Sequence, residues 1–139
     1  MEKIVVATTD KCYLNDETGK TFVETDQLGG NDPYSASKAA SDHLVRAWHH
    51  TYGLPVLTTN CSNNYGPGQH VEKLIPRIID SCINWTPIPL HGDGSHKRDW
   101  IYVDDHCRGI WAAYSKGIAG EVYNFGGHSE RANIDVVKG

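Results

Sequence analysis

The sequence predicts an α/β fold built around a parallel sheet, and two strand-like runs joined by a helical segment carry this prediction. Ile4–Ala7 is a continuous apolar run that ends in polar residues, which is typical of a strand buried on both faces. A second run of this kind, Pro55–Thr59, follows after a long connection. Because parallel neighbours need a crossover, usually a helix, the strand, connection and strand form one parallel unit.

The connection between these two strands divides into a loop and a helix. Residues 13–33 are polar and contain several glycines, which predicts a long loop. Small and apolar side chains then recur at helical spacing from Tyr34 to Thr51, and Gly53 supplies the stop. Asn60–His70, which follows the second strand, is expected to be a loop.

Shorter patterns predict the later elements. A helix is expected from Glu72 to Asn84, with Pro76 in its first turn, where a missing amide costs nothing. The remaining expectations are an extended piece at 88–90, a turn at 92–94, an extended stretch at 99–102, a helix capped by Asp104 or Asp105 and ending near Lys116, a strand at 121–125 and a first helical turn at 134–139.

Composition narrows the class of protein. The net charge is −4 and the basic residues are scattered, which argues against a nucleic-acid partner. No apolar run approaches the about 18 residues of a membrane span, and the first residues lack the apolar length of a secretory signal, so we expect no membrane partner and a cytoplasmic protein. The four cysteines form no C-x-x-C pair, so we interpret them as free thiols and predict no metal site.

The spacing of Tyr34 and Lys38 indicates catalysis. Tyr34 alone among the seven tyrosines has a lysine four residues later. On a helix this spacing places the phenol and the ammonium on one face, where the cation would stabilise a phenolate base. Thr9 and Asp10 end the first strand, which is where open α/β sheets place their chemistry. The sequence contains no G-x-G-x-x-G turn of the kind that seats a dinucleotide pyrophosphate.

Six blocks of sequence, in order, resemble the nucleotide-sugar 4,6-dehydratases of the extended short-chain dehydrogenase/reductase superfamily. They are Thr9–Tyr13, Asp32–Lys38, Asn60–Pro67, Glu72–Pro76, Gly92–Gly94 with Arg98–Trp100, and Tyr123–His128. The resemblance covers essentially the whole chain but only the middle and later part of such an enzyme. It implies an incomplete Rossmann-like parallel sheet, the second half of the NAD-binding domain, at 1–65. Part of a small α/β substrate-binding domain is implied at 66–139, with a returning Rossmann strand near 121–125.

The resemblance also implies NAD as cofactor and assigns catalytic roles. Tyr34 would take the proton of the sugar 4-hydroxyl, and Lys38 would stabilise its phenolate and hold the nicotinamide ribose. Thr9 would hydrogen-bond the sugar at the same oxygen, and Asp10 would protonate the departing C6 hydroxyl. Lys11 departs from the dTDP-glucose enzymes, which carry Glu there as the base for C5. Since an ammonium is a poor base, Lys11 would instead work with Asp10 or stabilise the enolate.

The remaining implied contacts bind the cofactor and a nucleotide-diphosphate sugar. Asn63 would face the sugar and Asn64 the nicotinamide, and Arg98 would clamp the pyrophosphate. Other nucleotide contacts are implied for Lys73, Leu74, Pro89, Leu90, His91 and Asn133. The resemblance further implies that the full-length enzyme is a homodimer.

Several alternatives stay open at this point. The blocks from Asn60 onward resemble the dTDP-glucose enzymes, whereas the first blocks resemble the CDP-glucose enzymes, so the nucleotide base is undecided. Relatives that catalyse 4-epimerisation or decarboxylation of UDP-glucuronate usually have Ser or Thr after the strand, so the pair Asp10–Lys11 favours elimination. A non-catalytic binding remnant is the remaining alternative. The 139-residue chain by itself is expected to show no turnover.

Overall fold

The computed structural model describes residues 2–15, 19–90 and 92–139, and these residues form two compact units. The first unit comprises Met1–Cys61 and Asp104–Phe125, and the second comprises Ser62–Val103 and Gly126–Gly139. Each unit is therefore built from two separate stretches of the chain. None of the helices in the described part has the length and apolarity needed to span a bilayer.

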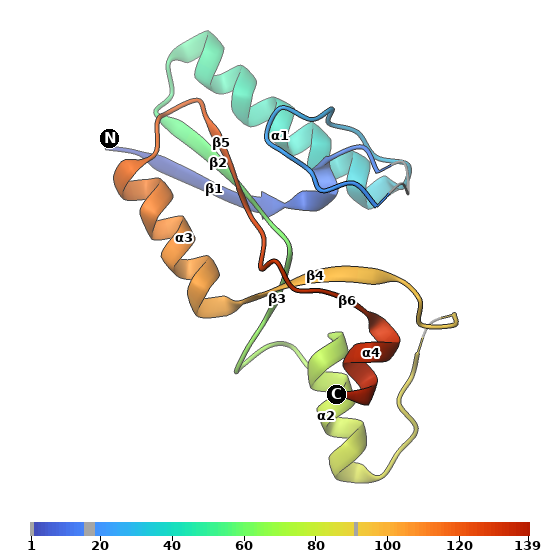
Figure 1. The fold of residues 1–139 in the computed structure, drawn as a ribbon. Coiled ribbons are helices and arrows are strands. Elements are labelled where there is room, and N and C mark those ends of the chain that lie inside the picture. Colours follow the sequence, from blue (N-terminus) through green and yellow to red (C-terminus); the bar gives the residue numbers. More distant parts are fainter. Residues whose placement is uncertain (1, 16–18, 91) are drawn as a thin grey trace. The chain divides into compact units, whose positions relative to one another are not determined.

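The first unit contains a three-stranded parallel sheet. Its strands are β1 (Ile4–Thr9), β2 (Val56–Cys61) and β5 (Val122–Phe125), in the order β1-β2-β5. Helices α1 (Pro33–Tyr52) and α3 (Val103–Lys116) lie on opposite sides of this sheet (Figure 1). β2 is the central strand, and its first five residues are buried, as expected for a parallel strand covered on both faces. The parallel α/β sheet predicted from the sequence is confirmed.

Local sequence signals account for the ends of α1. Pro33 occupies its first position, where the fixed φ suits a helix and no amide is lost. Gly53 ends the helix in the left-handed region at φ 66°, and its N–H donates to the carbonyl oxygen of His49. The predicted stop at Gly53 is therefore confirmed, and the helix is one residue longer at each end than predicted.

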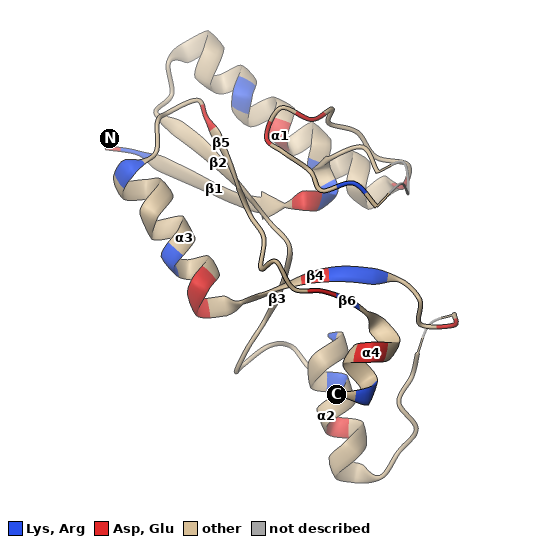
Figure 2. Ribbon diagram, in the orientation of Figure 1, with Lys and Arg blue, Asp and Glu red and all other residues tan. Residues whose placement is uncertain are grey.

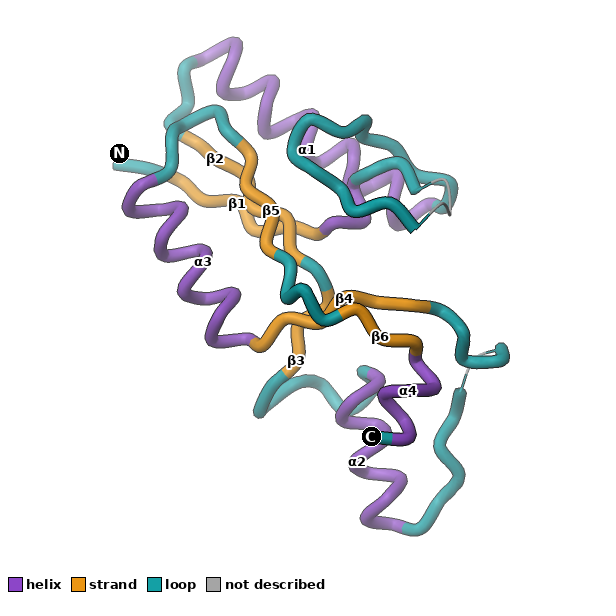
Figure 3. Tube along the Cα trace, viewed as in Figure 1, coloured by secondary structure: helices purple, strands orange, loops and turns teal. Residues whose placement is uncertain are grey.

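The second unit contains a mixed three-stranded sheet. β3 (Asn63–Tyr65) pairs in parallel with β4 (Lys97–Tyr102), which pairs antiparallel with β6 (Glu130–Ala132). Figure 3 shows these three strands in orange. The helices of this unit are α2 (Leu74–Asn84) and α4 (Asn133–Lys138). Pro76 is the third residue of α2, within the first turn as predicted.

The structure differs in detail from two expectations and adds one strand. The segment Asn60–His70 is not all loop, because β2 extends through Cys61 and β3 follows at once. β6 was not expected. Asp104 and Asp105 do not precede α3 as caps but lie inside its first turn, where carboxylates still favour the positive end of the helix dipole.

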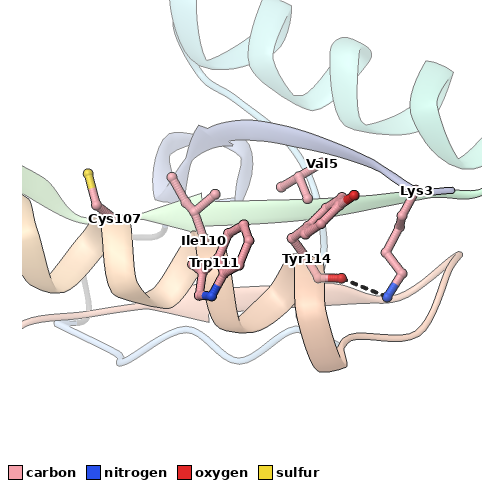
Figure 4. Close-up of a pocket in the computed structure, with 6 residues that line it drawn as sticks. All are labelled: Lys3, Val5, Cys107, Ile110, Trp111 and Tyr114. Carbon is pink, nitrogen blue, oxygen red and sulfur yellow. Dashed lines mark hydrogen bonds between the residues drawn. The ribbon is translucent and has the colours of Figure 1, made fainter.

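A cleft of about 530 Å³ lies beside β1 and α3 within the first unit. Its lining, drawn in Figure 4, consists of Lys3, Val5, Cys107, Ile110, Trp111 and Tyr114. The Lys3 ammonium donates to the carbonyl oxygens of Tyr114 (2.9 Å) and Gly117 (2.6 Å), near the carboxyl end of α3. No predicted site residue lines this cleft.

Candidate functional site

The carboxyl end of β1 carries the first group of predicted site residues. Thr9 Oγ1 donates to Asp10 Oδ1 at 3.2 Å and accepts a hydrogen bond from the Lys11 backbone N–H at 3.4 Å. The Lys11 ammonium lies 3.6 Å from the same Asp10 oxygen, with both side chains partly exposed. The structure thus brings together a hydroxyl, a carboxylate and an ammonium at the carboxyl end of a parallel strand, where open α/β sheets place their chemistry.

The beginning of α1 carries Tyr34 in its first turn and Lys38 one turn later. The Asp32 carboxylate caps the helix by accepting from the backbone N–H groups of Tyr34 (2.9 Å) and Ser35 (3.0 Å). The Lys38 ammonium lies 5.5 Å from the centroid of the Tyr34 ring, so the two side chains share one face as their spacing predicted. The Tyr34 ring is 56% exposed. Between described residues its hydroxyl makes no hydrogen bond, which leaves it open to a ligand.

A close backbone contact fixes this turn of α1 against the preceding loop. A Cβ at Gly30 would overlap the backbone N of Ala36 and the carbonyl carbon of Ser35. Only glycine permits this approach. The loop that contains Gly30 therefore sets the position of the helix turn from which Tyr34 projects.

Tyr13 anchors the 3₁₀ turn η1 (Asp10–Cys12) and was not predicted as a site residue. Its side chain is buried; its hydroxyl donates to Asn124 Oδ1 at 2.8 Å and accepts from Asn60 Nδ2 at 3.1 Å. These bonds tie the turn after β1 to β2 and β5. Because the partners lie 47 and 111 residues away, no local pattern could have indicated the role.

The same turn packs its thiol against α1. Cys12 is fully buried, and burial together with the negative charges of Asp42 and Asp10 raises the pKa of its thiol to about 12. Asp42 is itself buried on α1 and pairs with Arg46 one turn later. The turn that carries Asp10 and Lys11 is therefore held by a neutral thiol on one side and by the Tyr13 hydroxyl on the other.

Asn63 and Asn64 lie in the second unit, on β3. Asn63 pairs in register with Trp100 and Asn64 with Ile101. The Asn64 side chain donates to the carbonyl oxygen of Ser62 at 3.3 Å. A strand, and not the predicted loop, therefore holds these amides.

The predicted nucleotide contacts of the second unit lie around α2 and the segment after it. Lys73 immediately precedes α2, and Leu74 is its first residue. Pro89 and Leu90 belong to a stretch without regular structure, and His91 lies outside the described residues. Leu90 is held in place because Gly94 packs against it: a Cβ at Gly94 would lie 2.6 Å from Leu90 Cδ2.

Arg98 lies on β4, and Asn133 is the first residue of α4, directly after β6. Arg98 is exposed on β4, and Asn133 follows β6, its backbone N–H donating to the carbonyl oxygen of His96 at 3.0 Å. Asp99, next to Arg98, accepts from the N–H groups of Gly127 and Ser129, each at 2.6 Å. Burial alone would raise the pKa of this carboxyl, but these bonds hold it below its usual value. Asp99 thereby fixes the segment that leads into β6, a role the sequence analysis missed.

The structure thus brings the predicted residues together in small groups. Thr9, Asp10 and Lys11 contact one another, as do Tyr34 and Lys38. Between described residues no hydrogen bond or ion pair joins these two groups. The described ranges also contain no group of three or more His, Cys, Asp or Glu residues that could hold a metal ion.

Comparisons with known proteins identify a family and several similar enzymes. The family profile described as "NAD dependent epimerase/dehydratase family" matches residues 1–126. The chain is 60% identical over 131 residues to the dTDP-glucose 4,6-dehydratase of Xanthomonas campestris pv. campestris, covering 94% of the chain and 37% of the relative. The corresponding enzyme of Neisseria meningitidis is 53% identical over the same length. The chain therefore spans little more than a third of the length of these curated relatives.

Solved structures agree with these relatives. The dTDP-glucose 4,6-dehydratase of Bacillus anthracis in complex with NAD has a TM-score of 0.91 at 45% identity, over 98% of this chain and 44% of that one. A double mutant of the Streptomyces venezuelae enzyme, solved with NAD and a second ligand, has a TM-score of 0.93 at 44% identity, over 99% and 42% of the two chains. The resemblance predicted from the six sequence blocks is confirmed.

Proposed function

Because the chain belongs to the NAD dependent epimerase/dehydratase family, we propose that it carries part of the active site of an NAD-dependent nucleotide-sugar 4,6-dehydratase. The reaction is the loss of water from a nucleotide-diphosphate glucose to give the 4-keto-6-deoxy sugar. The dTDP sugar is the first candidate, in keeping with the names of the similar enzymes, and the CDP sugar is the second.

The observation that carries this proposal is the contact between Asp10 and Lys11 at the end of β1. Removing water across C5 and C6 needs a proton donor for the departing hydroxyl and stabilisation of negative charge after C5 loses its proton. A carboxyl group and an ammonium 3.6 Å apart, beside the Thr9 hydroxyl, provide both functions. A 4-epimerase oxidises and reduces C4 alone and has no use for this pair.

The remaining steps concern proton transfer and binding by residues of this chain. The Tyr34 phenolate accepts the proton of the 4-hydroxyl, and the Lys38 ammonium stabilises the phenolate from one turn away. Asp10 gives its proton to the C6 oxygen, so that water leaves. The Asp10–Lys11 pair accepts the proton of C5 and returns a proton to C5 when C6 is reduced, and Thr9 hydrogen-bonds the oxygen at C4. Tyr34 and Lys38 would hold the nicotinamide ribose of NAD, and a bound NAD would supply reversible hydride chemistry at C4 and C6, so that no external oxidant is needed.

The residues present fit one end of the cofactor. Tyr34 is exposed near the start of α1, and the Lys38 ammonium lies 5.5 Å from the centroid of its ring, so a hydroxyl and an ammonium suited to ribose hydroxyls stand together. The family resemblance assigns the Asn64 amide to the nicotinamide. The sequence has no G-x-G-x-x-G turn for the pyrophosphate. We therefore expect the 139-residue chain alone to give no turnover. The assignment of 1–65 to cofactor binding and of 66–139 to substrate binding, and the homodimer, remain predictions.

A chimaera of this chain with a similar enzyme tests the proposal. The matched 131-residue segment of the Xanthomonas campestris enzyme is replaced by this chain, and the 4-keto-6-deoxy sugar is measured by its alkaline absorbance with dTDP-glucose and CDP-glucose. We expect product from the chimaera. Tyr34→Phe should lower turnover by roughly 10²–10⁴-fold, the usual contribution of a general base. Tyr52→Phe, which alters a tyrosine at the other end of α1, is the matched control.

Lys11 separates elimination from the alternative reactions. In the chimaera, Lys11→Met should preserve oxidation at C4 but block exchange of the C5 proton with deuterated solvent. Normal C5 exchange in Lys11→Met would show that the lysine has no part in elimination. If the folded chimaera interconverts 4-epimers without losing water, the chain belongs to an epimerase and not to a dehydratase. If the folded chimaera binds nucleotide but shows no turnover, the chain is a binding remnant.

A further inference from the structure

The antiparallel ribbon of β4 and β6 separates its charged side chains onto two faces. The register pairs Lys97 with Ala132, Arg98 with Arg131, and Asp99 with Glu130. Side chains of paired residues point to the same face, and successive residues alternate. One face therefore carries Lys97, Asp99 and Glu130, and the other carries both arginines. Figure 2 shows the basic colour over the first part of β4.

The charges on the first face are compensated. The Lys97 ammonium lies 3.2 Å from Glu130 Oε1. The Asp99 carboxylate accepts the two backbone N–H groups that hold the segment before β6. This face needs no further ligand to satisfy its charged groups.

The charges on the second face are not compensated. Arg98 and Arg131 stand directly opposite each other, and both are exposed. Among the described residues neither forms an ion pair or a side-chain hydrogen bond. Like charges directly opposite on a sheet destabilise it, so the fold gains nothing from placing two guanidinium groups here. A dianionic ligand would turn this repulsion into attraction.

We propose that Arg131 is a second cation of the diphosphate site and, together with Arg98, clamps the two adjacent phosphate groups of the nucleotide sugar. The inference rests on the proposed function; the family resemblance behind that function assigns a diphosphate contact to Arg98 and none to Arg131. Directly opposite residues have Cβ atoms about 5 Å apart, so two guanidinium forks can each take one phosphate group. Asn133 begins α4 directly after β6, and its backbone N–H donates to the carbonyl oxygen of His96, which holds the start of α4 against the residue before β4. Its buried Oδ1 has no hydrogen-bond partner among the described residues.

Calorimetric titration of the 139-residue chain tests this inference. The parent chain, Arg131→Gln, Arg98→Gln and Lys97→Gln are titrated with dTDP, inorganic pyrophosphate and thymidine. Each arginine variant should bind dTDP roughly tenfold more weakly, because a charge-assisted pair to phosphate is lost, while thymidine binding is unchanged. Lys97→Gln removes the same charge from the opposite face and should bind dTDP within about twofold of the parent.

The outcomes separate this inference from the proposed function. If Arg98→Gln weakens dTDP binding but Arg131→Gln does not, Arg131 is only a solvated side chain and the inference fails, although the function stands. If the parent does not bind dTDP, or if neither arginine matters, the diphosphate placement of Arg98 fails as well. If Arg131→Gln also weakens thymidine binding, Arg131 has a structural role. If Arg131→Gln loses only pyrophosphate binding and keeps dTDP binding, the arginine belongs to a site for free anions. Either result overturns the inference.

Discussion

At the scale of single residues, Cys12 combines complete burial with two nearby carboxylates. Burial, Asp42 and Asp10 raise the pKa of its thiol from 9.0 to about 12. A shift of this size lowers the thiolate fraction near pH 8 by about 10³-fold, so iodoacetamide should leave Cys12 unmodified in the folded chain while labelling the exposed Cys82 and Cys107. Mass spectrometry of labelled peptides measures this difference. Labelling of Cys12 as fast as Cys82 under native conditions would contradict the burial of η1.

The same shift determines how stability depends on pH. The raised pKa means that the unfolded chain loses the thiol proton before the folded chain does. The contribution of Cys12 is therefore fully present below pH 9.0 and is lost as the pH rises toward about 12. Urea unfolding measures the free energy of unfolding between pH 9.0 and about 12. Over this range the free energy of unfolding should fall less for Cys12→Ala than for the parent. Cys82→Ala, which removes an exposed thiol, should lose as much stability as the parent.

At the scale of elements, the first turn of α1 depends on its contact with Gly30. Gly30→Ala should destabilise the chain by about 1–3 kcal/mol, as overpacking against backbone usually does, and should displace the turn that carries Tyr34. Urea unfolding gives the free energy, and the amide chemical shifts of residues 34–36 report the displacement. Gly53→Ala is the control: its Cβ meets nothing within 4 Å, so it costs only left-handed strain of about 1 kcal/mol. Unchanged shifts at residues 34–36 in Gly30→Ala would show that the contact does not position the turn.

Local signals explain which elements the sequence predicts well. The helix stop at Gly53 and Pro76 within the first turn of α2 follow from backbone constraints of single residues. Contact of Lys38 with Tyr34 follows from helical spacing. β3 and β6 were missed because each has three mostly polar residues and exists only through pairing with β4, which is distant in the sequence. Tyr13 was missed for the same reason, since its partners Asn60 and Asn124 come from other strands.

At the scale of the whole molecule, the two edges of the first sheet differ. The edge at β5 is partly covered, because the Asn124 N–H donates to Glu24 Oε1 at 2.8 Å. Within the described residues β1 pairs only with β2, so its outer edge presents unpaired backbone groups beside the cleft shown in Figure 4. Trp111, a lining residue of that cleft, is 68% exposed. An open apolar edge of this kind promotes pairing with another chain.

We therefore expect the 139-residue chain to self-associate through β1 and the adjoining cleft. Light scattering coupled to gel filtration should show a mass that rises with concentration. Trp111→Lys should weaken this association roughly tenfold or more, because a large apolar side chain is replaced by a charge at the contact. Trp85→Lys makes the same change at a tryptophan that is 95% exposed in the second unit, so it should behave as the parent does. A mass that stays monomeric at every concentration, or equal effects of the two substitutions, would mean that this edge is not the contact.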